Sequence, residues 1–130
     1  MSSTVEVTTA KVQTIEHSTA GSVATDNVVR GTAKAWISWT YSSSTPTTRD
    51  SFNITSNTDT GTGDAAFNLT NAMDSRFNPC CTSGSQHATT GNALVDKDSS
   101  SIYAMRLFNN SGSATDGGGD NSLNITGDLA

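Results

Sequence analysis

The sequence predicts an all-β protein, an antiparallel, jelly-roll-like sandwich that carries an extended N-terminal arm. Ser and Thr fill 40 of the 130 positions, with 11 Asn and 11 Gly, and these residue types are poor or middling helix formers that favour turns. Short runs alternate apolar and polar residues, the period of a strand. Segments rich in Gly, Ser and Asn separate the runs. We expect the arm over residues 1–30 and the sandwich over residues 31–130.

The first 30 residues carry little material for a core. Val5 and Val7 alternate with polar neighbours, but the following segment is mostly small and polar. Val28 and Val29 are its main pair of adjacent apolar residues, so we expect them to contact another subunit. The segment is therefore interpreted as an attachment arm.

The clearest strand begins at Ala33. Ala35, Ile37, Trp39 and Tyr41 share one face with Ala33, and Trp36 projects to the other face. One interpretation makes the Trp39 face the core and leaves Trp36 to cover a loop. The other makes this aromatic set, Trp36, Trp39 and Tyr41, an interface with a subunit or a sugar, because exposed aromatic surface marks binding sites.

A β-hairpin is expected next. Residues 42–48, with Pro46, suggest a turn or loop, and residues 49–56 suggest a strand with Phe52 and Ile54 inward. The Gly-rich segment 59–64 then connects to a second strand with Phe67 and Leu69 inward.

The C-terminal half is less regular. Residues 71–92 are expected to be mainly loop, with room for a short strand. Residues 99–109 form a strand that is apolar on both faces, which predicts a central position or a subunit contact. Residues 111–120 end in three glycines and predict a loop, and Leu123 with Ile125 marks a closing strand.

Charge and size limit the partners. The net charge of −5 and pI of about 4.6 oppose binding to nucleic acid, and no stretch approaches the ~20 apolar residues of a membrane span. With two Trp, two Tyr and four Phe, the core is thin for a domain of this size. We expect subunit association to add stability, and therefore a homo-oligomer.

Catalysis and metal binding find little support in the residues. Cys80 and Cys81 are adjacent, and with His87 they lack the four spaced ligands of a zinc site. Reduced thiols are the favoured state, with a vicinal or inter-subunit disulfide as the alternative. The acidic residues around the three glycines lack an EF-hand pattern, and no nucleophile elbow occurs. We predict no enzyme, no metal and no cofactor.

Three segments carry a resemblance to a known family. The segments are 31–37 (GTAKAWI), 49–56 (RDSFNITS) and 58–64 (TDTGTGD), and residues 12–19 add to them. Over roughly the first 75 residues, the chain resembles small tail-fibre-like virion proteins of marine and freshwater tailed bacteriophages, including phages of cyanobacteria. Residues 41–48 and the Cys80-Cys81 pair depart from the family pattern.

The resemblance implies a structural virion protein, a tail-fibre or receptor-binding component that contacts the host surface. Its expected partners are other virion proteins, further copies of itself with a trimer favoured, and a host surface polysaccharide. A capsid decoration protein is the alternative, and a carbohydrate-binding module is a minor one. Loops 42–48, 82–92 and 111–120 are the candidate receptor-facing segments, because they are polar and Gly-rich. Their candidate residues are Ser43, Thr45, Thr47, Ser85, His87, Thr89, Ser113 and Asp116.

Overall fold

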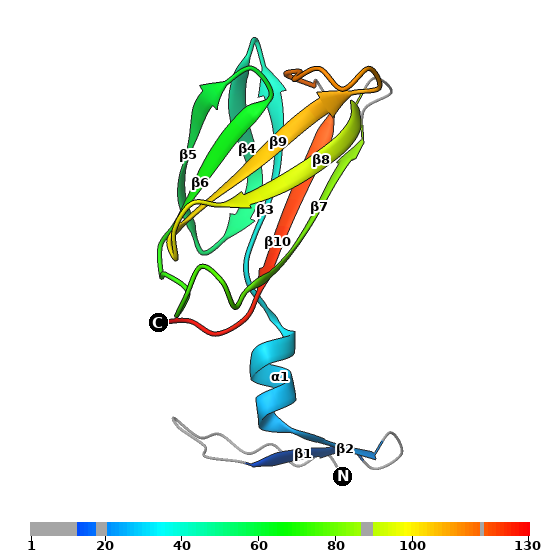
Figure 1. Cartoon of the computed structure of the whole chain (residues 1–130). Helices are drawn as coiled ribbons and strands as arrows, with labels where there is room; N and C mark the ends of the chain where they lie inside the picture. The colour runs from blue at the N-terminus through cyan, green and yellow to red at the C-terminus, as the bar shows by residue number, and fades with distance from the viewer. Residues whose placement is uncertain (1–12, 18–20, 87–89, 118) are drawn as a thin grey trace.

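The computed structural model describes residues 13–17, 21–86, 90–117 and 119–130. Two four-stranded antiparallel sheets pack face to face and form a β-sandwich (Figure 1). This arrangement confirms the predicted all-β antiparallel sandwich. Its strands are β3 (Ala33–Ser42), β4 (Thr45–Phe52), β5 (Ile54–Gly61), β6 (Asp64–Leu69), β7 (Cys80–Gln86), β8 (Thr90–Lys97), β9 (Ile102–Asn109) and β10 (Asp120–Thr126).

The strands pair in two sheets. The first sheet has the order β4-β3-β10-β7, and the second sheet has the order β5-β6-β9-β8. Hairpins β3–β4, β5–β6 and β8–β9 each stay within one sheet, whereas the chain changes sheet between β4 and β5, β6 and β7, β7 and β8, and β9 and β10. The strands β4, β7, β5 and β8 are therefore the edges of the sandwich.

The core lies between the sheets and follows the two-residue period of the strands. In β3 the buried positions alternate with partly exposed ones, as the sequence predicts. The Trp39 ring lies 5.3 Å from the Phe67 ring of β6 and 5.1 Å from the Tyr41 ring, measured between centroids. Trp39 therefore contacts both sheets. Leu123 and Ile125 of β10 are also buried, at 1% and 0% exposure, which confirms the closing strand.

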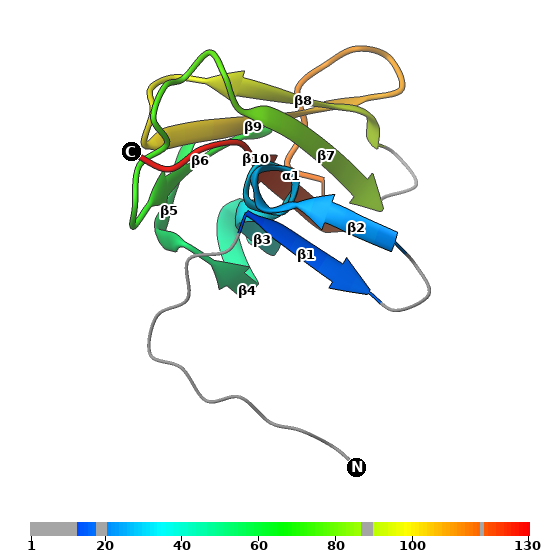
Figure 2. The same ribbon diagram turned by 90° about the horizontal axis from the view of Figure 1, so that it is seen from below.

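The arm contains regular structure where it is described. Strands β1 (Thr14–His17) and β2 (Gly21–Ala24) form an antiparallel hairpin, and the helix α1 (Thr25–Gly31) leads from it to β3. The Thr25 amide and hydroxyl both donate to the Gln13 carbonyl oxygen. Figures 1 and 2 show the hairpin and helix projecting from one end of the sandwich. We call this end proximal and the opposite end distal.

The turn between β3 and β4 is tighter than predicted. The expected turn or loop is present, but its predicted extent of 42–48 is wrong, because only Ser43 and Ser44 separate the strands and Pro46 already lies in β4. Both turn residues have positive φ, 51° and 61°, as a two-residue hairpin turn of the favoured hand requires. Ser is an uncommon choice at such positions, and this explains why the sequence predicts a longer connection than the structure has. Pro46 is tolerated because β4 is an edge strand.

The expected single strand over residues 49–56 is also wrong. Asn53 breaks it into β4 in the first sheet and β5 in the second. Asn53 has φ 58°, and its side-chain amide donates to the carbonyl oxygens of Lys34 and Asn71, each at 3.0 Å. Its side-chain oxygen accepts the Asn71 amide at 2.8 Å. The corner leaves Phe52 exposed at 54% instead of inward, whereas Ile54 packs against the core.

The segment 71–92 holds more strand than expected. β7 and the start of β8 occupy part of it, so Cys80 and Cys81 open a strand instead of lying in a loop. Residues such as Thr82 and Gly84 give a weak strand signal, and β7 is fixed by seven register pairs with β10. By contrast, β9 lies between β6 and β8, which confirms its predicted central position.

Replacing Asn53 tests the corner. We expect Asn53→Ala to lower the free energy of unfolding by about 3 kcal/mol, because it removes all the side-chain hydrogen bonds of Asn53 and forces Ala to positive φ. Asn53→Gly also removes the hydrogen bonds, but Gly adopts positive φ without strain, so the free energy of unfolding should fall by less, about 2 kcal/mol. Urea denaturation of both variants measures the difference. Equal stability of Asn53→Ala and the parent chain would contradict this role.

Candidate functional site

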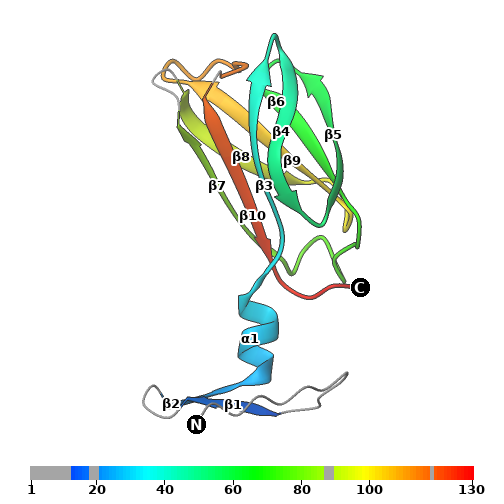
Figure 3. The same ribbon diagram turned by 180° about the vertical axis from the view of Figure 1, so that it is seen from behind.

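The distal end gathers the β3–β4 turn, the β5–β6 turn and the β9–β10 connection (Figures 1 and 3). Two of these are locked together. The Gly63 amide donates to the Asp116 Oδ1 atom at 2.6 Å, and the Gly63 carbonyl oxygen accepts the Leu107 amide at 2.7 Å. The Thr115 amide donates to the Leu107 carbonyl oxygen at 3.1 Å. The long connection is thus held against the β5–β6 turn.

This end holds three of the eight predicted receptor-facing residues, Ser43, Ser113 and Asp116, although the sequence separates them widely. Ser43 and Ser113 are exposed, and Asp116 is half-buried because it binds Gly63. Ser85 belongs to β7 and is half-buried. Thr45 and Thr47 are exposed residues of β4, so they lie on a strand and not in a loop. His87 and Thr89 lie outside the described residues.

The predicted interface residues separate into two groups. Trp39 and Tyr41 are 0% and 7% exposed, so their place in an interface is wrong: alternation along β3 turns them into the core. Trp36 points the other way and is half-buried on the outer face of the first sheet. Val28 is half-buried in α1, and Val29 is 54% exposed there. Val29 and Trp36 therefore remain available for contacts.

The outer face of the first sheet combines aromatic and small polar side chains. Trp36 lies opposite Phe52 in the β3–β4 register. On its other side it faces Asn124 of β10, which faces Thr82 of β7. This lateral row thus runs Phe52, Trp36, Asn124, Thr82, and side chains opposite one another on neighbouring strands lie close enough to interact. Sequence analysis placed Phe52 inward and therefore missed the row.

A second row lies beside the first, toward the distal end. It contains Asp50, Ser38, Ser122 and Gly84 in register across the four strands. Ser38, Gly84 and Ser122 line a depression of about 340 Å³, together with Ser85, Gln86, Asp120 and Asn121. The small side chains keep it open. A Cβ atom on Gly84 would lie 3.3 Å from the Ser122 Oγ atom.

An ion pair spans this face. The Arg49 guanidinium of β4 lies 2.7 Å from the Asp120 carboxylate of β10, and both side chains are about half exposed, 55% and 50%. The pair reaches over β3, the strand between them. Its contribution to stability is small because solvent screens it. Its consequence is that these two charges neutralise each other.

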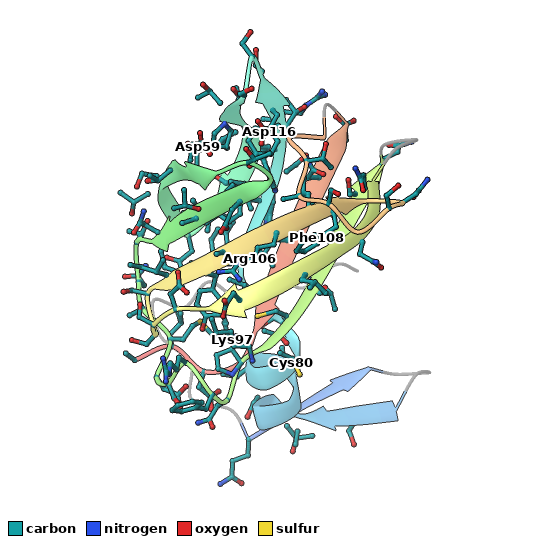
Figure 4. All side chains as sticks on the ribbon, turned by 45° about the horizontal axis from the view of Figure 1, so that its top comes forward. Asp59, Cys80, Lys97, Arg106, Phe108 and Asp116 are labelled. Atoms are coloured by element: carbon teal, nitrogen blue, oxygen red, sulfur yellow. The ribbon has the colours of Figure 1, made fainter. Side chains whose placement is uncertain are left out.

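The second sheet has a different outer face. Arg106 of β9 lies 3.2 Å from the Asp64 carboxylate and 3.4 Å from the Asp96 carboxylate, and Figure 4 shows Arg106 at the middle of this sheet. Leu94, opposite Arg106 on β8, is 56% exposed. This face therefore centres on an arginine held between two carboxylates, without the aromatic row of the first sheet.

Both tyrosines have buried hydroxyl groups without a hydrogen-bond partner within the described part of the chain. Burial, followed by the negative charges of Asp116, Asp59 and Asp64, raises the pKa of Tyr41. Figure 4 shows Asp59 and Asp116 at the same end. Burial raises the pKa of Tyr103 to about 12. Neither hydroxyl is therefore ionised near neutral pH.

The cysteines are both free thiols. Cys80 is exposed and Cys81 is half-buried, because successive side chains of a strand point to opposite faces. Burial raises the pKa of the Cys81 thiol, which keeps it protonated and poorly reactive.

Among the described residues, no three His, Cys, Asp or Glu side chains are arranged to hold a metal ion. No helix in the described part of the chain has the length and apolar character needed to span a membrane. Comparisons with protein-family models, curated proteins and solved structures found no match.

Gly63 offers a test of the distal lock. It has φ +72°, and a Cβ atom there would lie 2.6 Å from the Leu107 carbonyl oxygen and 2.7 Å from the Thr115 amide nitrogen. We expect Gly63→Ala to lower the free energy of unfolding by about 2 to 4 kcal/mol. Gly112→Ala is the matched control, because Gly112 has φ +78° but no atom within 4 Å of the added Cβ. Urea denaturation measures the free energy of unfolding of both variants. An equal loss in Gly63→Ala and Gly112→Ala would contradict a stabilising role for the close packing at Gly63.

Tyr103 makes the chain sensitive to high pH. A phenol whose pKa is raised from 10.0 to about 12 by folding contributes stability that is complete below pH 10 and is lost as pH rises toward 12. The melting temperature should therefore fall over this range. Tyr103→Phe should reduce the slope, because it removes the ionisable group. An unchanged slope in Tyr103→Phe would contradict the assignment.

Proposed function

We propose that this chain is a structural virion protein of a tailed phage, a tail-fibre component that contacts the host surface. One observation carries the proposal: the described part of the arm lies at the proximal end, while the β3–β4 turn and the β9–β10 connection, which belong to the predicted receptor-facing segments, lie at the distal end (Figure 1). A domain attached at one end and free at the other can present its distal surface to a cell. The sequence resemblance to tail-fibre-like proteins supports the same role.

The surface chemistry also supports it. The exposed residues of the distal end are mainly Ser, Thr and Gly, which form adaptable hydrogen bonds and tolerate variation in connections. Such contacts are individually weak, and repeated copies on one particle raise the total affinity. A homo-oligomer, with a trimer favoured, would supply those copies. The arm and the exposed Val29 of α1 are the proposed contacts with other virion proteins or neighbouring subunits.

Location on the particle is the first test. Gold-labelled antibody against the chain should mark the tail of the phage that encodes it. Label spread over the head would reject the fibre role and favour a decoration protein, with the arm as capsid anchor. Unlabelled particles would reject a virion role altogether.

Competition tests the distal surface. The purified chain should reduce adsorption of the phage to host cells, because it occupies the same receptor. A Ser111→Arg/Ser113→Arg variant, with both changes in the exposed β9–β10 connection, should compete at least tenfold less well. Phe77→Arg is the control, since Phe77 is 76% exposed in the β6–β7 connection at the proximal end. Equal competition by all three proteins would reject the distal end as the receptor surface.

A further inference from the structure

We infer that the outer face of the first sheet binds a neutral polysaccharide chain, with Trp36 and Phe52 as the platform for a sugar ring. The inference deepens the proposed function, because it names the chemical class of the receptor and adds a surface to the distal end. It rests on four features: an exposed aromatic pair, flanking hydroxyl and amide groups, an open depression, and the balance of charge.

The aromatic pair is not explained by folding. Phe52 is 54% exposed on an edge strand, and Trp36 opposite it is only half-buried. Neither residue belongs to the core cluster, which is formed by inward residues of both sheets. Packing of the core therefore does not require an aromatic residue at position 36 or 52. One face of a sugar ring presents C–H groups, which pack favourably on the electron-rich face of an aromatic ring.

Groups that suit sugar hydroxyls continue from this pair. Asn124 and Thr82 lie in the same lateral row, and Ser38 and Ser122 lie in the next. Hydroxyl and amide groups both donate and accept hydrogen bonds, and so do the hydroxyls of a sugar. The first row therefore has the apolar-plus-polar composition that small-molecule sites commonly show.

The second row provides space. The depression of about 340 Å³ begins at Ser38 and Ser122 and reaches Gln86 and Asp120. Gly84 forms part of its lining without a side chain. From Phe52 to Gln86 the face thus crosses all four strands, a length suited to several sugar units of an extended polymer. Figure 3 shows the hairpin β1–β2 and the helix α1 beyond the proximal end of this sheet, not across its outer face.

Charge selects a neutral ligand over an acidic one. Arg49 and Asp120 neutralise each other at 2.7 Å. The positive charge of Lys34, on the same face of β3 as Trp36, offsets the negative charge of Asp50 in the second row. The whole chain carries −5. The net negative charge of the chain would repel an acidic polysaccharide. An uncharged polysaccharide is not repelled, and it leaves the Arg49–Asp120 ion pair intact.

Affinity electrophoresis tests the inference. The full chain is run through gels that contain dextran, laminarin, galactomannan, or the neutral or acidic polysaccharide fraction of the host envelope, separated by anion exchange. We expect retardation by at least one neutral polymer. Phe52→Ala and Trp36→Ala should each weaken it about tenfold or more, as truncation of an anchor residue does.

Two further variants make the result independent of folding defects. Ser122→Gln adds bulk to the depression at an exposed strand position and should weaken retardation by a similar factor. Phe77→Ala removes an exposed aromatic ring away from the face and should leave retardation unchanged. Melting temperatures within a few degrees of the parent chain identify the variants whose binding can be compared.

Several outcomes would overturn the inference: retardation by no neutral polymer, retardation by the acidic fraction alone, or equal retardation of Phe52→Ala, Ser122→Gln and Phe77→Ala. Loss of self-association in Phe52→Ala, without loss of retardation, would show that a second copy covers the face. These results do not depend on where gold label falls on the particle. A negative result for sugar binding can therefore be distinguished from a negative result for the virion role.

Discussion

The contact between Trp39 and Phe67 is the interaction on which the sandwich depends. Trp39 belongs to the first sheet and Phe67 to the second, and their ring centroids lie 5.3 Å apart. Few other large side chains are available, since the chain has two Trp and four Phe and one of each, Trp36 and Phe52, lies on the outer face. The thin core therefore relies on close packing of a few residues, including Met105 and Leu107, both fully buried.

This constraint shapes the surface as well. Because β3 commits Trp39 and Tyr41 to the core, alternation directs Trp36 outward, where Phe52 faces it in register. The distal end is fixed separately, through hydrogen bonds of the Gly63 backbone with Asp116 and Leu107. The proposed receptor contacts thus rest on rigid strands and on a connection tied to a neighbouring turn. Both arrangements limit the loss of conformational freedom on binding.

Sequence reasoning succeeded where the two-residue period was strong and failed where a single residue redirected the chain. The strands around Trp39, Phe67, Met105 and Leu123 were predicted because their apolar residues alternate. Asn53 was not identified as a corner, since its effect depends on hydrogen bonds to Lys34 and Asn71, which are 19 and 18 positions away. For residues 71–92 the sequence left room for a short strand but gave no position for it, because the residues of β7 gain strand structure from pairing with β10.

The sequence by itself determined the all-β class, the inward faces of β3, β6 and β10, and the polar character of the distal connections, because local periodicity and composition encode these properties. Only the tertiary structure decided that Phe52 stands beside Trp36 and that Asp116 holds Gly63. Both depend on register between strands and on contacts across long stretches of chain. Such contacts leave no local pattern, since any of several registers would satisfy the same alternation.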